Sequence, residues 1–198
     1  MIVRRAVRRE SVWQRVVSVD ERLLLTVRSW ESRFMTRLMR VLTHLGDPAS
    51  WVLLGLALGF AGGAGPRLCA LLGSSAFLAL GISQPLKRLC RRSRPSSGIG
   101  GFAALVENPD VFSFPSGHTS VAFAIAAAFA GQAVGPLGTL LLALAIGIGV
   151  SRVYLGAHYP LDVAAGALVG TVCGTAAKLL VIEYPLLKLL GYATLASF

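Results

Sequence analysis

Long stretches without a charged residue restrict most strongly what this chain can fold into. Residues 48–66 and 68–86 contain no Asp, Glu, Lys or Arg, and neither do residues 119–151. A further apolar stretch runs from about residue 160 to residue 182. A helix needs about 20 apolar residues to cross the hydrocarbon core of a bilayer. These stretches therefore predict helices that span a membrane.

The stretch 119–151 is too long for one span, and the segment Gln132-Ala-Val-Gly-Pro136 is expected to divide it in two. We therefore predict an all-α, integral-membrane helical bundle with about five spans. The spans are rich in glycine and alanine, which lets helices pack closely in lipid. Only 14% of the residues are charged, against about 25% in a typical soluble domain, and this supports residence in a membrane.

The N-terminal segment has a different character, because ten arginines precede residue 41. From Asp20 onward, apolar residues recur at three- and four-residue steps, as an amphipathic helix requires. It is too charged to span a membrane, and its Arg, Trp and Leu content suits the headgroup region. We predict an Arg-rich segment with an interfacial helix over residues 1–46, followed by a transmembrane domain over residues 47–198. The apolar face of this helix comprises Val27, Trp30, Phe34, Leu38, Val41 and Leu45.

The net charge of +10 does not indicate a nucleic-acid partner, because no nucleic-acid-binding motif accompanies it. The cysteines Cys69, Cys90 and Cys173 are isolated in the sequence, so we expect neither a disulfide framework nor a zinc site. The first 22 residues lack the apolar core of a signal peptide.

The alternation of the predicted spans brings the polar span ends to one face of the bundle. The second span ends near Lys87, the third begins near His118, the fourth ends near Arg152 and the fifth begins near His158. All four points fall on the same side of the membrane, here called the motif face. The turns around residues 65–67 and 132–136 fall on the opposite side.

The motif face carries groups suited to an anionic phosphate. Arg94 and Arg152 offer guanidinium forks that match phosphate oxygens, and Lys87 adds a point charge. Ser116 and Gly117 stand where a helix begins, and a helix N-terminus presents unpaired N–H groups to an anion. Gly117 permits close backbone approach, and Ser116 adds a hydroxyl donor. We predict that these five residues bind the phosphate.

Two histidines and an aspartate on this face suit phosphoryl transfer. His158 and Asp162 are four residues apart, so the carboxylate of Asp162 can orient the imidazole and steady its positive charge. His158 is predicted to attack phosphorus as the nucleophile, and His118 to protonate the leaving oxygen. A phosphohistidine would form and be hydrolysed by water. No carboxylate cluster for Mg²⁺ is visible, so we expect neither a metal nor another cofactor.

Three fragments occur in a fixed order, namely Lys-x6-Arg-Pro at 87–95, Pro-Ser-Gly-His at 115–118 and Ser-Arg-x5-His-x3-Asp at 151–162. Together they resemble the signature of the type 2 phosphatidic acid phosphatase (PAP2) superfamily. That superfamily includes lipid phosphate phosphatases, bacterial polyprenyl diphosphate phosphatases and soluble vanadium haloperoxidases. The resemblance implies the same roles for the phosphate ligands, the acid, the nucleophile and its orienter. Many membrane members resemble a six-span bundle, whereas this sequence predicts five.

The remaining polar residues have simpler interpretations. Arg88, Arg91 and Arg92 suit an anchor for anionic lipid at the membrane surface. Asp47 precedes Pro48 and is interpreted as the cap of the first span.

Several functions stay open at this stage. The substrate is expected to be a lipid-linked phosphate or diphosphate: a phosphatidylglycerol phosphate, a phosphatidic acid, a polyprenyl diphosphate or a polyprenyl-linked phosphosugar. The alternative is a non-catalytic membrane protein that binds lipid phosphates or scaffolds partners, although the intact His118, His158 and Asp162 set argues against it. Haloperoxidase chemistry with vanadate is a third possibility, which the membrane-spanning hydropathy disfavours.

The sequence also bears on location. We expect a bacterial cytoplasmic membrane, with membrane lipids as neighbours and the oligomeric state open. If the N-terminal segment does not cross the membrane, the motif face holds sixteen of the nineteen Lys and Arg residues. The positive-inside tendency then favours a motif face in the cytoplasm. Many bacterial members resemble enzymes whose sites face away from the cytoplasm, so the alternative orientation stays open.

Overall fold

The computed structural model describes residues 12–108, 110–132 and 136–183 of the 198. Within these ranges the chain is helical, with no strand beyond an isolated bridge between Ser93 and Phe112. The elements are α1 (Val12–Arg28), α2 (Arg33–Leu45), α3 (Pro48–Phe60), α4 (Gly65–Cys90), α5 (Pro95–Gly98), α6 (Gly117–Phe129), α7 (Leu137–Tyr154), α8 (Pro160–Lys178) and the π-helical turn η1 (Leu179–Glu183).

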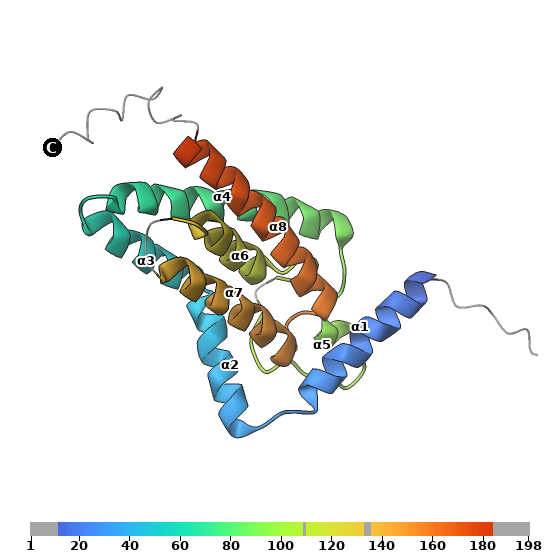
Figure 1. Ribbon diagram of the computed structural model, residues 1–198. Helices are drawn as coiled ribbons and strands as arrows, with labels where there is room; N and C mark the ends of the chain where they lie inside the picture. Colours follow the sequence, from blue (N-terminus) through green and yellow to red (C-terminus); the bar gives the residue numbers. More distant parts are fainter. Residues whose placement is uncertain (1–11, 109, 133–135, 184–198) are drawn as a thin grey trace, which may run out of the picture.

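Helix α6 forms the centre of the bundle. It packs most extensively against α8 and also contacts α7 and α4 (Figure 1). Most of its residues are buried, and Ala124, Ile125 and Phe129 have no exposed surface. The core is therefore built around a short apolar helix, and the first turn of that helix carries the Pro-Ser-Gly-His motif.

A stripe of glycines lets α8 lie directly on the backbone of α6. A Cβ atom added at Gly170 would stand 2.2 Å from the carbonyl oxygen of Ser120, and one at Gly174 would stand 2.0 Å from that of Ala124. At Gly166 the corresponding distance to the carbonyl oxygen of Ser116 is 2.7 Å. Small residues at four-residue spacing allow this approach between helices in lipid. The close packing also sets the first turn of α8 beside the first turn of α6.

Three helices are long and apolar enough to cross a membrane: Gly65–Cys90, Leu137–Tyr154 and Pro160–Ile182. The pair α2 and α3 meets the same test as one span bent by 55°. Helices α3 and α6 coincide with two further predicted spans but have 13 residues each. The predicted class, an all-α membrane bundle, is confirmed, whereas the number of five spans stays a prediction.

The N-terminal region differs in detail from the predicted single helix that begins at Asp20. Helix α1 already begins at Val12, and the chain breaks between Arg28 and Arg33. The break follows from local chemistry, because the hydroxyl of Ser32 accepts a hydrogen bond from the Met35 N–H and caps α2. Residues 1–11 and 184–198 of the two predicted domains lie outside the described residues. The interfacial role and the domain division stay predictions.

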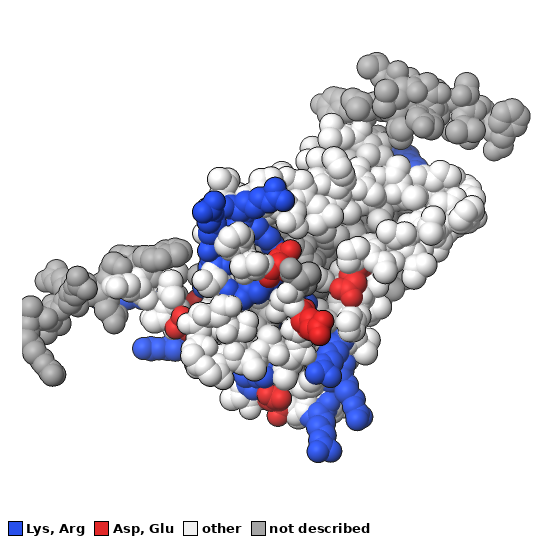
Figure 2. Space-filling view, turned by 180° about the vertical axis from the view of Figure 1, so that it is seen from behind, with Lys and Arg blue, Asp and Glu red and all other residues white. Residues whose placement is uncertain are grey.

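The surface separates polar from apolar regions. Figure 2 shows most of the Lys, Arg, Asp and Glu side chains gathered at the end of the molecule that carries α1 and α2, while much of the bundle beyond them is white. Large apolar side chains point outward from the bundle, among them Phe60, Phe77 and Leu168, which are 88%, 75% and 68% exposed. An exposed apolar belt of this kind fits a lipid surrounding.

Candidate active site

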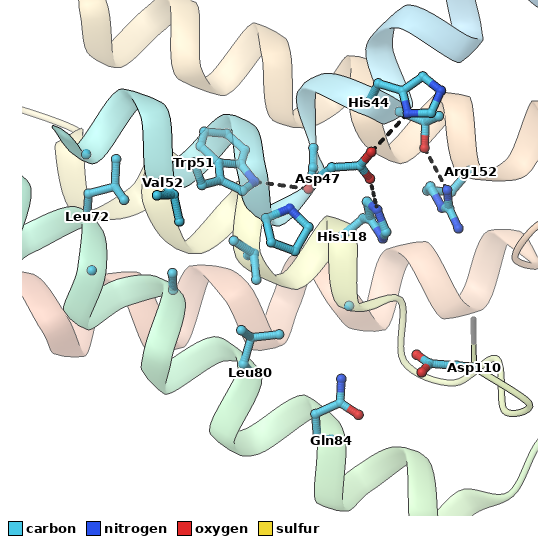
Figure 3. A pocket seen from close by; sticks show the side chains of 18 of the residues that line it. His44, Asp47, Trp51, Val52, Leu72, Leu80, Gln84, Asp110, His118 and Arg152 are labelled. Carbon is cyan, nitrogen blue, oxygen red and sulfur yellow. Dashed lines mark hydrogen bonds and ion pairs between the residues drawn. The ribbon is translucent and has the colours of Figure 1, made fainter. Parts of the chain in front are cut away.

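A cavity of about 990 Å³ opens where the ends of α2, α4, α6 and α7 meet. Of the residues predicted to contact phosphate or protonate the leaving group, Lys87, Gly117, His118 and Arg152 line it. They come from α4, α6 and α7, and Figure 3 shows His118 directed at Asp47, with Arg152 nearby. The structure thus brings together groups that are up to 65 residues apart in the sequence.

The two predicted guanidinium ligands are fixed by uncharged acceptors. The side-chain oxygen of Asn108 accepts hydrogen bonds from Arg94 Nη1 at 3.2 Å and from Arg152 Nη2 at 3.1 Å. Arg152 also donates to the Thr43 hydroxyl at 2.6 Å, and Arg94 donates to the Ala157 carbonyl at 2.7 Å. Both guanidinium groups are almost fully buried. They are therefore held in place while much of their positive charge stays unneutralised.

The Asp110 side chain lies between Lys87 and Arg94. Its carboxylate forms an ion pair with Lys87 and stands 3.9 Å from Arg94 Nη2. Burial alone would raise the pKa of the Asp110 carboxyl, but the hydrogen bond from Lys87 and the charges of Lys87 and Arg94 hold that pKa below its ordinary value. A carboxylate is thus bound where a phosphate would meet the same two cations.

His158 is buried behind this cluster, in the turn between α7 and α8. Its Nε2 atom lies 3.4 Å from Arg94 Nη1, and its Nδ1 atom lies 3.6 Å from Asp162 Oδ2. Nδ1 forms no hydrogen bond. Burial first, and then the positive charges of Arg152 and Arg94, lower the pKa of His158 well below its ordinary value. The imidazole is therefore neutral at neutral pH.

The second histidine, His118, is paired with Asp47, which the sequence analysis interpreted as the cap of the first span. His118 Nε2 lies 2.8 Å from Asp47 Oδ1, while His44 Nδ1 lies 2.9 Å from Asp47 Oδ2 (Figure 3). Asp47 does precede α3, but its side chain makes no capping hydrogen bond to that helix. Its carboxylate instead bridges the two imidazoles at the junction of α2 and α3.

Ser116 does not line the cavity. Its hydroxyl accepts a hydrogen bond from Thr119, and its backbone N–H donates to the Asp162 carbonyl. The predicted contact of this hydroxyl with phosphate therefore stays a prediction. Gly117 does line the cavity, and a Cβ atom added there would stand 3.8 Å from Lys87 Nζ.

The cavity continues from this polar end into an apolar groove between α3 and α4. Trp51, Val52 and Leu56 line it from α3, and Leu72, Ala76 and Leu80 line it from α4. Gly55 on α3 and Gly73 on α4 widen the passage because they carry no side chain. One continuous space therefore offers cations at one end and aliphatic walls at the other.

Sequence reasoning missed several polar groups of this region. Asp20, Thr43, Asn108 and Asp110 lie outside the three motifs, and nothing in their local sequence distinguishes them. Arg92 lies within the first motif, but its sequence context suggested a lipid anchor. In the structure it is an ion-pair partner of Asp162. In the part of the chain that the structure describes, no three His, Cys, Asp or Glu side chains converge as metal ligands.

The geometry can be compared with known proteins. The family model of the PAP2 superfamily matches residues 68–184, and this chain belongs to that superfamily. The assignment confirms the predicted class of enzyme, a membrane lipid phosphatase.

Relatives and solved structures agree with this class. The chain is 37% identical to the decaprenylphosphoryl-5-phosphoribose phosphatase of Mycobacterium tuberculosis, over 68% of this chain and 74% of the relative. It is 33% identical to the lipid A 1-phosphatase of Rhizobium johnstonii, over 75% of this chain and 73% of the relative. The crystal structure of Aquifex aeolicus LpxE superposes with a TM-score of 0.71 at 26% identity, covering 79% of this chain and 92% of the other. The PAP2-type phosphatidylglycerolphosphate phosphatase from Bacillus subtilis superposes with a TM-score of 0.65 at 26% identity, covering 83% and 85%.

Proposed function

We propose that this chain removes the phosphate of a lipid-linked phosphate or diphosphate through a phosphohistidine on His158. One observation carries the proposal: a single cavity joins the buried cations Lys87 and Arg152, with His118 beside them, to an apolar groove. A lipid with a terminal phosphate combines the two matching chemistries. Its phosphate fits the cationic end, and its tail fits the groove.

The first chemical step forms the covalent intermediate. The phosphate displaces the Asp110 carboxylate and binds Lys87, Arg94 and Arg152. His158 Nε2, which faces Arg94, attacks phosphorus, and the bond between phosphorus and the leaving oxygen breaks. His118 donates its proton to that oxygen. Asp162 stabilises the positive ring through Nδ1, and the three cations stabilise the charge that develops on the phosphoryl oxygens.

The second step regenerates the enzyme. Water attacks the phosphohistidine, His118 accepts a proton from that water, and the P–N bond breaks to release inorganic phosphate. Asp47 holds His118 in orientation during both transfers, because their side chains are hydrogen-bonded. No metal takes part in this sequence of steps.

The relatives narrow the substrate class. The mycobacterial relative is named for a polyprenyl-linked phosphoribose phosphate, and the rhizobial relative for lipid A. The mycobacterial name denotes a phosphate on a polyprenyl-linked sugar. We therefore propose a polyprenyl-phosphosugar phosphate as the first substrate to test, ahead of phosphatidic acid and phosphatidylglycerol phosphate.

The first experiment measures phosphate release by purified full-length protein in detergent with excess EDTA. The panel contains phosphatidic acid, phosphatidylglycerol phosphate, undecaprenyl diphosphate and a polyprenyl-phosphoribose phosphate. We expect EDTA-resistant release from at least one lipid, abolished in His158→Ala. Quenching in alkali with labelled substrate should trap a labelled phosphate on the protein that is stable to base and released by acid, as a bond between phosphorus and nitrogen is. Folded protein that binds these lipids but releases no phosphate would instead support the alternative of a lipid-binding protein.

We further propose that the site lies in a bacterial cytoplasmic membrane and faces the cytoplasm. The arginine-rich N-terminal segment supports this orientation, and so does the contact of Asp20 in α1 with Arg92 next to the site. The test is labelling of a Ser97→Cys variant that lacks Cys69, Cys90 and Cys173. Ser97 is exposed on α5. Reaction with a membrane-impermeant maleimide only after the cells are opened is expected, and reaction in intact cells contradicts the orientation.

A further inference from the structure

A buried carboxylate reaches the active site from outside the region that the family model matches. That model begins at residue 68, whereas Asp20 lies on α1 and is only 1% exposed. A carboxylate so deeply buried is costly unless it is paired and hydrogen-bonded. Both of its oxygens have partners: Oδ2 accepts from Arg92 Nη2 at 2.5 Å, and Oδ1 accepts from the Leu161 N–H at 2.9 Å.

Arg92 divides its guanidinium between two carboxylates. One nitrogen donates to Asp20, and the other donates to Asp162 Oδ1 at 2.7 Å. The guanidinium carbon also stands 4.1 Å from the centre of the Tyr159 ring, a favourable position for a cation. Three contacts therefore fix this side chain, unlike that of its neighbour Arg91, which is exposed.

Asp162 in turn faces the nucleophile with its second oxygen. Oδ2 accepts a hydrogen bond from the Tyr159 N–H at 2.9 Å and stands 3.6 Å from His158 Nδ1. The chain of contacts thus runs from Asp20 through Arg92 and Asp162 to His158. The bond from the Leu161 N–H to Asp20 fixes the first turn of α8, which carries Asp162.

We propose that Asp20 is a positioning residue for the reaction: by holding Arg92 and the start of α8, it keeps the Asp162 carboxylate directed at His158. This inference rests on the proposed function. The segment before the matched family region is then part of the active-site architecture rather than only a membrane anchor.

Charge balance explains why a second carboxylate is needed. Asp162 alone with Arg92 would form a closed, neutral pair and offer little negative charge to the ring of His158. With Asp20 sharing the guanidinium, two carboxylates face one cation, so the group of Asp20, Arg92 and Asp162 keeps a net negative charge on the Nδ1 side of the imidazole that becomes positive during attack. Loss of Asp20 should therefore weaken the attack itself. The phosphate contacts from Lys87, Arg94 and Arg152 do not involve Asp20, so substrate binding should be little changed.

The experiment compares steady-state kinetics of full-length variants on the lipid that wild type hydrolyses. Asp20→Asn is expected to lower kcat by about 10- to 100-fold, the range seen when an outer partner that orients a metal-bound histidine is lost, with KM within about twofold of wild type. Asp20→Glu should recover part of the lost kcat. The matched control is Glu21→Gln, which removes the adjacent carboxylate on the same helix and should leave both constants unchanged.

A second variant keeps the inference testable if Asp20→Asn does not fold. Should Asp20→Asn lose its thermal transition in detergent, the double variant Asp20→Asn, Arg92→Gln removes the charges of both partners, while Asp162 keeps its hydrogen bond from the Tyr159 N–H. It is expected to fold with the same low kcat and an unchanged KM. A normal kcat in either folded variant overturns the inference. It is also overturned if Glu21→Gln loses as much kcat as Asp20→Asn does. Retained activity in His158→Ala would instead overturn the proposed function, and the inference with it.

Discussion

Asp110 is the residue that competes most directly with a phosphate for the site. Its carboxylate is bound to Lys87 and stands near Arg94. The variant Asp110→Asn removes the competing charge and keeps the side-chain volume. We expect the inhibition constant for inorganic phosphate to fall about tenfold, the equivalent of about 1.4 kcal/mol, measured by inhibition at fixed substrate. An unchanged constant in folded protein would show that Asp110 does not occupy the phosphate position. Glu107→Gln, at the rim of the same cavity, is the matched control.

Asp47 has a testable role through His118. Because its carboxylate holds His118 by a 2.8 Å contact, Asp47→Asn should disorient the proposed acid. A general acid typically raises the reaction rate about 10²- to 10⁴-fold. We therefore expect kcat to fall at least tenfold for substrates with a poor leaving group. An activated ester with a phenolate leaving group needs no proton and should be affected much less. Equal losses on both substrates would argue against this assignment.

The low pKa of His158 predicts a pH dependence of stability. The unfolded state takes up a proton on this histidine below about pH 6.5, whereas the folded state, with its depressed pKa, does not. Stability contributed by the neutral buried ring is therefore present above that pH and lost as the pH falls through the window below it. We expect the melting temperature of wild type to fall more steeply than that of His158→Gln between pH 7.5 and pH 5.5. Parallel curves would contradict the assignment of a neutral, buried ring.

At the scale of the helices, the glycine stripe of α8 has a direct mechanical consequence. Gly170→Ala would bring a Cβ atom to 2.2 Å from a carbonyl oxygen of α6, so the two helices must separate. Overpacking of this kind costs about 1–3 kcal/mol. We expect a lower melting temperature in detergent and reduced activity, since both first turns carry site residues. Gly81→Ala on α4 should be neutral or slightly stabilising, because a Cβ atom added there would have no neighbouring heavy atom within 4 Å apart from the backbone of its own helix. Equal effects of the two variants would contradict the packing account.

The elements that the sequence revealed are those determined by local hydropathy. Apolar stretches located α3, α4, α6, α7 and α8, and the alternation of spans explained why Lys87 and His118 meet. The break between α1 and α2 was not foreseen, because the apolar periodicity continues through Trp30 and hides the cap at Ser32. Asn108, Asp110 and Asp20 were missed for a different reason. Their roles depend on which cations the folded chain places opposite them, and no spacing in the sequence reports that.

At the scale of the whole molecule, the cavity connects the phosphate site to the lipid-facing bundle. Tail binding in the groove between α3 and α4 should contribute to turnover of long-chain substrates. Val52→Trp, which narrows the groove, is expected to lower kcat/KM for a long-chain lipid phosphate at least fivefold while sparing a short, water-soluble phosphomonoester. Leu53→Trp is the control, because Leu53 neighbours Val52 but does not line the cavity. Equal effects on long and short substrates would place the tail elsewhere.

The pairing of Asp20 with Arg92 also bears on how such a chain can change over time. Loss of Arg92 would leave the buried Asp20 carboxylate without its cation, which costs several kcal/mol, so a lineage that loses Arg92 is under pressure to lose Asp20 as well. The two positions, 72 residues apart, are therefore expected to be inherited as a unit. A recombination event that exchanged the N-terminal segment between two family members would separate them, and its products would have to restore the pair before they regained full turnover.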